Sequence, residues 1–220
     1  SAALLRAAAA RASRLAIHCA EVPEEQQFLH TGRGPFADLL AELGKLPARH
    51  RAAGCGAVRW LARNGALRPT TQLVHCQELE RGDVARIAEA GASIVVCPGT
   101  IAWFARTPPP VPSWLAAGIP VGLGTDSAAS NDGLSMRREL ARAAATWPGL
   151  SPGQLLAMAT TGAARALGAP CGALTRGRRA DLVLVEPGRD WPETLAAFVH
   201  GRAALRGVVC AGRARKGARR

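Results

Sequence analysis

The 220-residue sequence predicts an α/β fold in which short parallel strands alternate with helices. Three observations support this class. Four short apolar runs are rich in leucine and β-branched residues, helical stretches separate them, and each run closes on polar residues. Hydrophobic residues make up 48% of the chain, which is enough for the core of a sizeable domain.

The elements alternate along the chain. An alanine-rich amphipathic helix is expected over 1–13. The predicted strands occupy 14–21, 71–78, 93–100 and 120–127. The predicted helices between and after them occupy 24–32, 34–44, 54–66, 79–91, 111–118, 134–147 and 151–168. The character of the sequence changes after Gly168, where 172–187 and 205–215 predict a small antiparallel β element.

Composition narrows the function classes. The net charge is +12, but the basic residues are dispersed except for "GRARKGARR" at the end, which is expected to be a solvated terminus. No tyrosine is present to make a stacking surface, so nucleic-acid binding is disfavoured. No apolar run reaches the roughly 18 residues that span a bilayer, so we expect no membrane partner. Six scattered cysteines without a CxxC pair predict reduced, mostly buried thiols in a cytoplasmic protein.

Polar residues gather at the carboxyl ends of the four predicted strands: His18, Glu21, His75, Thr100, Asp126 and Ser127. In parallel α/β sheets and barrels this edge is where chemistry is built. Two imidazoles and a carboxylate at strand ends suggest a divalent metal, and a second carboxylate nearby would move protons.

Each of these residues also has a structural interpretation. His18 and His75 could be buried histidines bonded to the backbone. Glu21 could favour the N-terminus of the following helix through the helix dipole. Asp126 could be a turn or N-cap residue. The occurrence of all four at the ends of the same predicted sheet favours the chemical interpretation.

An ordered set of motifs resembles a known family. The segments "HCAE", "LVHC", "CPGT" and "GLGTDSAASN", followed by "GALTRGRRADLVLVE", are similar to the amidohydrolase superfamily and its metal-dependent deaminase and chlorohydrolase branch. The segments "FLHTGRGPFADLLAELG" and "ARTPPPVPSWLAAGIPVGLGTDSAASN" most resemble the subgroup of aminodeoxyfutalosine deaminase-like proteins. The resemblance covers nearly all of 14–213.

The resemblance implies a role for each strand-end residue. His18 matches a metal ligand at the end of the fifth strand of a (β/α)8, or TIM, barrel. Glu21 matches the glutamate that moves a proton to a ring nitrogen of a heterocyclic substrate. His75 matches the histidine that orients the attacking water and polarises the reacting centre. Asp126 matches the aspartate that ligates the metal and takes a proton from its water. The implied metal is zinc, with iron as the alternative.

The sequence departs from the family pattern at its beginning. The family's first barrel strand carries an HxH metal motif, and this sequence contains no HxH. We therefore expect a partial TIM barrel, strands five to eight, over 1–168, and a C-terminal β-sandwich remnant over 169–220. A half barrel would expose apolar sheet surface, so we expect self-association or a partner that supplies the first half.

The candidate substrate contacts follow the third predicted strand. Trp103, with Phe104, could form an aromatic wall for a flat heterocycle or could plug the barrel mouth. Arg106 could meet an anionic group, although an orientation toward solvent is favoured.

Three functions follow from the sequence. The first is a metal-dependent hydrolase of C–N bonds, an aminohydrolase of a purine-like nucleoside, incomplete in this chain because HxH is absent. The second is a non-catalytic remnant or assembly module of the same fold. The third and least favoured is a basic nucleic-acid-binding protein. For the first, we predict that His18, His75 and Asp126 converge on a single ion.

Overall fold

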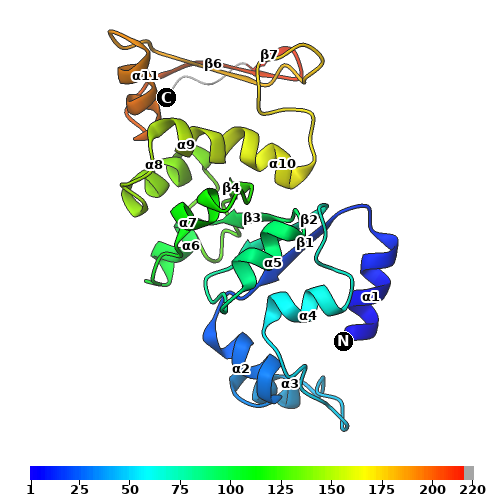
Figure 1. Cartoon of the computed structure of the whole chain (residues 1–220). Helices are drawn as coiled ribbons and strands as arrows, with labels where there is room; N and C mark the ends of the chain where they lie inside the picture. Colours follow the sequence, from blue (N-terminus) through cyan, green and yellow to red (C-terminus); the bar gives the residue numbers. More distant parts are fainter. Residues whose placement is uncertain (216–220) are drawn as a thin grey trace. The chain divides into compact units, whose positions relative to one another are not determined.

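The computed structural model describes residues 1–215, which form two compact units (Figure 1). The first unit comprises residues 1–94 and 116–119. The second unit comprises 95–115 and the chain from Pro120 onward. Within the described residues, no helix is both long and apolar enough to cross a membrane.

The first unit holds one helix before its first strand and alternates strands with helices after it. Its elements are α1 (Ala2–Arg11), β1 (Leu15–Cys19), α2 (Pro23–Thr31), α3 (Pro35–Glu42), α4 (Ala57–Arg63), β2 (Thr71–His75), α5 (Asp83–Glu89) and the start of β3 (Ser93–Val96). Proline at the first helical position starts α2 and α3, because it has no N–H to leave unpaired there. Gly32, with φ of +69°, ends α2 in the left-handed conformation that glycine adopts without strain.

Strands β1 and β2 pair in parallel, with Ile17 opposite Leu73 and Cys19 opposite His75. Leu73 and Cys19 are buried, whereas His18 is exposed on the other face of β1. Because side chains alternate across a strand, one face of this pair packs into the core and the other presents His18. The pairing confirms the predicted parallel α/β arrangement for these two strands.

The second unit holds the end of β3 and the rest of the chain. Its elements are α6 (Pro98–Trp103), most of α7 (Val111–Ala116), β4 (Val121–Leu123), α8 (Met136–Thr146), α9 (Pro152–Ala157), the π-helix η1 (Met158–Gly162), α10 (Ala163–Leu167), β5 (Leu182–Val185), α11 (Trp191–Val199), β6 (Leu205–Cys210) and β7 (Arg213–Arg215). The Gly124 N–H donates to the Val96 carbonyl at 2.9 Å, which links the end of β4 to β3.

Two helices, α6 and α11, lie where the sequence predicts no helix, and the single helix predicted over 151–168 is divided by the π-helix η1. The third predicted strand ends at Val96, and α6 begins at Pro98, because proline removes a donor from a strand but suits the first turn of a helix. Helix α11 was not predicted at all. It is capped by the Asp190 side chain, which accepts the Glu193 N–H at 2.8 Å, and its buried residues include Val199.

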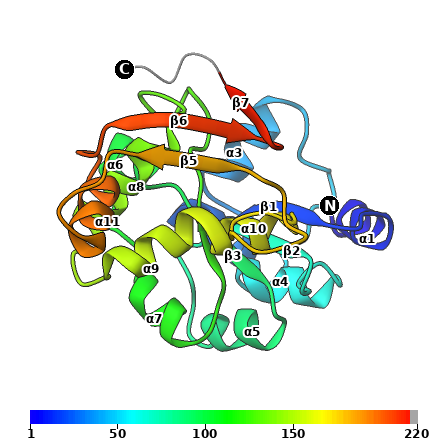
Figure 2. The ribbon, with the colours of Figure 1, turned by 90° about the horizontal axis from the view of Figure 1, so that it is seen from above.

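The C-terminal strands form an antiparallel sheet of order β5-β6-β7 (Figure 2). This confirms the antiparallel β element predicted after Gly168. The predicted domain boundary at 168 and the composite sandwich remain predictions.

The cysteines are all free thiols. Cys19, Cys55, Cys76 and Cys97 are buried, as predicted, whereas Cys171 and Cys210 are only half-buried. The hydrogen bond with Cys76 raises the pKa of the Cys19 thiol most, and burial raises it further.

We expect Gly162→Ala to lower the free energy of unfolding by about 1–3 kcal/mol, the usual cost of overpacking. A Cβ at Gly162 would lie 2.1 Å from the Val121 carbonyl oxygen, which belongs to the backbone of β4 and cannot rotate away. The matched control is Gly149→Ala, since a Cβ there would meet nothing within 4 Å. Urea titrations of both variants measure the difference, and equal stabilities would show that β4 and the π-helix are not packed this closely.

Candidate active site

Two histidines from neighbouring strands of the first unit lie close together. The ring centroids of His18 and His75 are 5.3 Å apart and their planes are tilted by 35°. His18 is exposed, whereas His75 is 2% exposed. Both sit at or next to the carboxyl end of their strand, as the sequence predicts.

The backbone at the end of β2 explains how His75 reaches His18. The strand register pairs His75 with Cys19, so regular alternation would place His75 on the face opposite to His18. His75 instead has φ of +76°, and Cys76 has φ of +54°. Non-glycine residues adopt this left-handed conformation at a cost, and such strain concentrates at functional sites. The departure from strand geometry brings the two imidazoles together.

Glu21 completes this group from the turn after β1. Its Oε2 lies 3.7 Å from His75 Nε2, and the Glu21 side chain is 26% exposed. The preceding residue, Ala20, also has a positive φ, of +50°. The first unit therefore brings together His18, Glu21 and His75, all three of which the sequence predicts as site residues.

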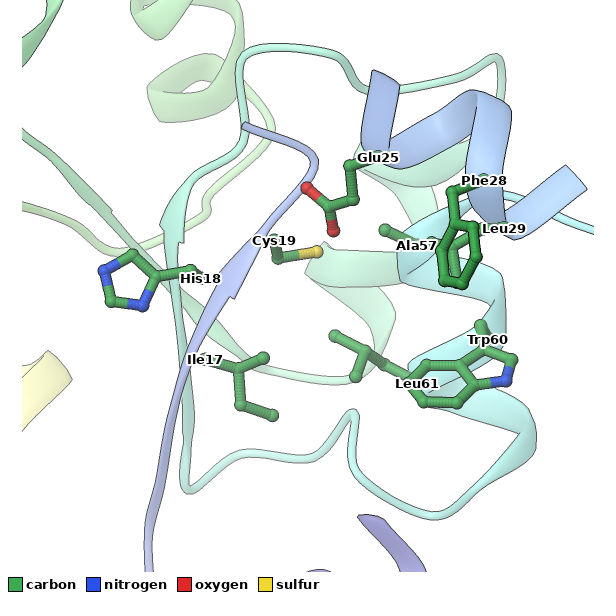
Figure 3. Close-up of a pocket in the computed structure, with 9 residues that line it drawn as sticks. All are labelled: Ile17, His18, Cys19, Glu25, Phe28, Leu29, Ala57, Trp60 and Leu61. Atoms are coloured by element: carbon green, nitrogen blue, oxygen red, sulfur yellow. The ribbon is translucent and has the colours of Figure 1, made fainter. Parts of the chain in front are cut away.

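Glu25 fixes the turn that carries Glu21. From the first turn of α2, its Oε2 accepts the Glu21 N–H at 2.9 Å. Figure 3 shows the Glu25 carboxylate on the Cys19 side of β1, and the His18 ring on the other side. A cavity of about 110 Å³ adjoins these residues, with Phe28 and Trp60 among its apolar lining. Glu25 is not among the predicted site residues, although its position four residues after Glu21 was the available signal.

The burial of Glu25 predicts a pH-dependent stability. Burial raises the pKa of the Glu25 carboxyl, which the hydrogen bond from Glu21 partly offsets. A carboxyl with a raised pKa in the folded state favours folding while it is protonated, and this contribution is lost as the pH rises through that pKa. We therefore expect Glu25→Gln to gain stability relative to the parent chain as the pH rises from about 4 to about 8.

Thermal unfolding across this pH range measures the effect, with the exposed neighbour substitution Glu24→Gln as control. Parallel stability profiles for Glu25→Gln and the parent would contradict it.

Asp126 lies in the second unit, three residues after β4. Its Oδ2 accepts two hydroxyl hydrogen bonds, from Thr100 at 2.9 Å and from Ser130 at 2.8 Å. Like His75, Asp126 has a left-handed backbone conformation, with φ of +55°. Helix α8 is capped by Ser135, so Asp126 is not the N-cap of that helix. Two donors on one oxygen fix the plane of this carboxylate, which suits a ligand or a base more than a turn residue.

The candidate substrate contacts lie at the end of α6. Trp103 is 55% and Phe104 48% exposed. The Arg106 guanidinium carbon lies 4.7 Å from the Phe104 ring centroid, a cation–π contact. The roles of Trp103 and Arg106 in substrate binding remain predictions.

A family model decides where this chain belongs. The model of the amidohydrolase family matches residues 2–215. The chain belongs to the amidohydrolase family.

Two of the curated proteins that this chain resembles are deaminases. The chain is 35% identical to aminodeoxyfutalosine deaminase from Deinococcus radiodurans over 177 residues, which cover 74% of the chain and 40% of that enzyme. It is 40% identical to a 5-methylthioadenosine/S-adenosylhomocysteine deaminase from Haloquadratum walsbyi over 121 residues, which cover 52% of the chain and 27% of that enzyme. The chain thus spans well under half the length of these relatives.

Two solved structures of zinc-containing enzymes are similar to this chain. An atrazine chlorohydrolase from Arthrobacter aurescens, complexed with zinc, superposes with a TM-score of 0.74 and 26% identity, over 100% of this chain and 48% of that one. An adenosine deaminase from Xanthomonas campestris with bound zinc superposes with a TM-score of 0.75 at 24% identity, over 97% of this chain and 48% of that one. The second likeness shows the fold alone.

The residues of this amidohydrolase chain fit a divalent metal. An exposed imidazole, a second imidazole with its centroid 5.3 Å away, and a carboxylate fixed by two hydroxyls are the ligand types that zinc and iron accept. His75 and Asp126 both have the left-handed backbone conformation that is costly for non-glycine residues and concentrates at functional sites.

Proposed function

We propose that this chain is the C-terminal half of a metal-dependent aminohydrolase that acts on a purine-like nucleoside. The observation that carries the proposal is the group of His18, Glu21 and His75 at two neighbouring strand ends, in a chain of the amidohydrolase family. In this proposal β1 to β4 correspond to strands five to eight of a (β/α)8 barrel, and β5 to β7 belong to a composite sandwich.

The proposed metal ligands from this chain are His18 and Asp126. A divalent ion, zinc or alternatively iron, supplies a Lewis acid and lowers the pKa of water toward about 7. Zinc in the atrazine chlorohydrolase structure, which is 26% identical to this chain, supports this choice.

The other roles belong to the chain's own side chains. Water replaces the amino group on the ring carbon, and ammonia leaves. Asp126 accepts the proton from the attacking water. Glu21 delivers a proton to the ring nitrogen, and His75 orients the water and polarises the reacting carbon. The 3.7 Å separation of His75 Nε2 and Glu21 Oε2 supports their action on the same substrate.

The substrate proposal rests on the relatives. Their names specify aminodeoxyfutalosine, 5-methylthioadenosine and S-adenosylhomocysteine as substrates, which are all purine nucleosides or nucleoside thioethers. The exposed Trp103 provides a flat apolar surface for such a base. Arg106, three residues after Trp103 and in contact with the Phe104 ring, is the second proposed substrate contact.

Activity requires metal ligands that this chain does not contain. Catalytic zinc sites normally use at least three protein ligands, and the sequence has no HxH to add to His18 and Asp126. We propose that a first barrel half, on the same or another chain, supplies them.

The test is complementation. The 220-residue chain is co-expressed with the HxH-bearing first half of the Deinococcus radiodurans enzyme, and zinc content and ammonia release from purine nucleosides are measured. We expect zinc and turnover only when both halves are present. A folded complex without zinc would overturn the enzyme proposal in favour of the non-catalytic remnant. Zinc without turnover on any purine nucleoside would overturn the substrate class alone.

A further inference from the structure

Glu139 on α8 is a fully buried carboxylate, 0% exposed, in the second unit. Three hydrogen bonds reach it. The Gly99 N–H donates to Oε2 at 2.6 Å, and Asn131 Nδ2 and Arg142 Nη1 donate to Oε1 at 2.9 and 3.1 Å. Buried charges are rare unless they are paired and hydrogen-bonded in this way. Each backbone segment that Glu139 holds also carries a hydroxyl bonded to Asp126.

The first arm runs through α6. Glu139 holds the Gly99 N–H, and the next residue, Thr100, donates its hydroxyl to Asp126 Oδ2 at 2.9 Å. Thr100 is completely buried. Gly99 is needed for this approach, because a Cβ there would lie 2.2 Å from Asn131 Nδ2. The carboxylate of Glu139 thus sets the position of the Thr100 hydroxyl through one peptide unit.

The second arm runs through the loop after β4. Asn131 Nδ2 donates to Glu139 and also to the Thr125 carbonyl at 2.8 Å. Thr125 directly precedes Asp126, and Ser130, which precedes Asn131, donates to Asp126 Oδ2 at 2.8 Å. The residues before and after Asp126 are therefore joined by hydrogen bonds within the loop, and the bond from Asn131 to Glu139 attaches the loop to α8.

Arg142 balances the buried charge. Its Nη1 also donates to Asn131 Oδ1 at 2.8 Å, and its Nη2 donates to the half-exposed Asp132 at 2.6 Å. Glu139 receives three donors on two oxygens, so an amide at this position would turn an N–H toward one of them. The arrangement requires a carboxylate.

We propose that Glu139 is the positioning residue of Asp126, acting through Thr100 on one side and Asn131 on the other. The inference rests on the proposed function, in which Asp126 is a metal ligand and base. Glu139 itself is proposed to contact neither substrate nor metal, because its carboxylate bonds Gly99, Asn131 and Arg142. It fixes the two hydroxyls that set the plane of the Asp126 carboxylate.

The first test follows amide hydrogen exchange in the 220-residue chain. In Glu139→Gln the new carbonyl oxygen should keep Asn131 and Arg142, since they are two donors and one is charged. The new side-chain NH₂ group then faces the Gly99 N–H and cannot accept its hydrogen bond. The rate of amide hydrogen exchange at Gly99 and Thr100 should therefore rise by about 10-fold or more beyond any global destabilisation. Asn131→Ala should instead raise exchange over 125–131. The control Asp132→Asn removes an exposed Arg142 partner and should change neither segment.

The second test uses Co²⁺ as a spectroscopic probe of the metal site in the complemented protein, because the proposed function expects a full ligand set only when both halves are present. Glu139→Gln should weaken Co²⁺ binding by roughly 10-fold or more and shift its visible absorption band, the usual size of effect for a residue that orients a ligand. Asp132→Asn should bind Co²⁺ like the complemented parent protein.

The two tests separate the inferences. If the complemented parent protein binds no Co²⁺, the metal proposal falls, and hydrogen exchange alone decides whether Glu139 orders the segments around Asp126. If Glu139→Gln and Asp132→Asn have the same exchange at 98–101 and 125–131, the positioning role is overturned. If exchange rises as expected but Co²⁺ binding and absorption are unchanged, Glu139 is only a structural anchor.

Discussion

Asp126→Asn is expected to abolish both deaminase activity and zinc retention in the complemented protein. The change removes a charged ligand and the base that accepts the proton from the attacking water. It keeps the size of the side chain, so the hydroxyls of Thr100 and Ser130 retain an oxygen acceptor. His18→Ala should give the same double loss, because it deletes a coordinating imidazole from an exposed position. We expect zinc content below about a tenth of the parent value for both changes, since one lost ligand is a large part of a three- or four-ligand site.

Elemental analysis and an ammonia-release assay on the same preparations measure both properties. The matched controls are Asp38→Asn and His200→Ala, which alter exposed residues of the same types and should leave both properties unchanged. Full zinc occupancy in either site variant would remove that residue from the ligand set.

Glu21→Gln is expected to separate catalysis from metal binding. The amide cannot deliver a proton, so turnover should fall by roughly 10²–10⁴-fold, the usual contribution of a positioned general acid–base group. Zinc content should stay at the parent level, because Glu21 is not proposed as a ligand. His75→Ala should behave in the same way if His75 orients water and substrate without ligating the ion.

Zinc content and turnover of the complemented protein again provide the measurement. Glu24→Gln is the control, since Glu24 is an exposed carboxylate in the first turn of α2, three residues further along the chain. Loss of zinc from Glu21→Gln as complete as from His18→Ala would make Glu21 a ligand. Unchanged turnover would leave Glu21 with a structural role at the start of α2.

The sequence by itself determined the elements and the identity of the candidate residues. Short β-branched runs and helical stretches predicted the strands β1 to β4 along the chain and most of the helices, because these patterns are local. Helix α11 escaped prediction even so, although its Asp190 cap and Pro192 are start signals that could have shown it. His18, Glu21, His75 and Asp126 could be named because each follows the end of an apolar run.

Only the tertiary structure decided how these residues are held. The strand register would place His75 away from His18, and the left-handed backbone at His75 reverses this. Glu139 lies 13 residues beyond Asp126 on a separate helix, and no local pattern marks it as a partner of Gly99 or Asn131. Sequence patterns report which side chains face the core, because burial follows the period of each element. Hydrogen bonds between distant segments depend instead on the packing of whole elements, which no local pattern encodes.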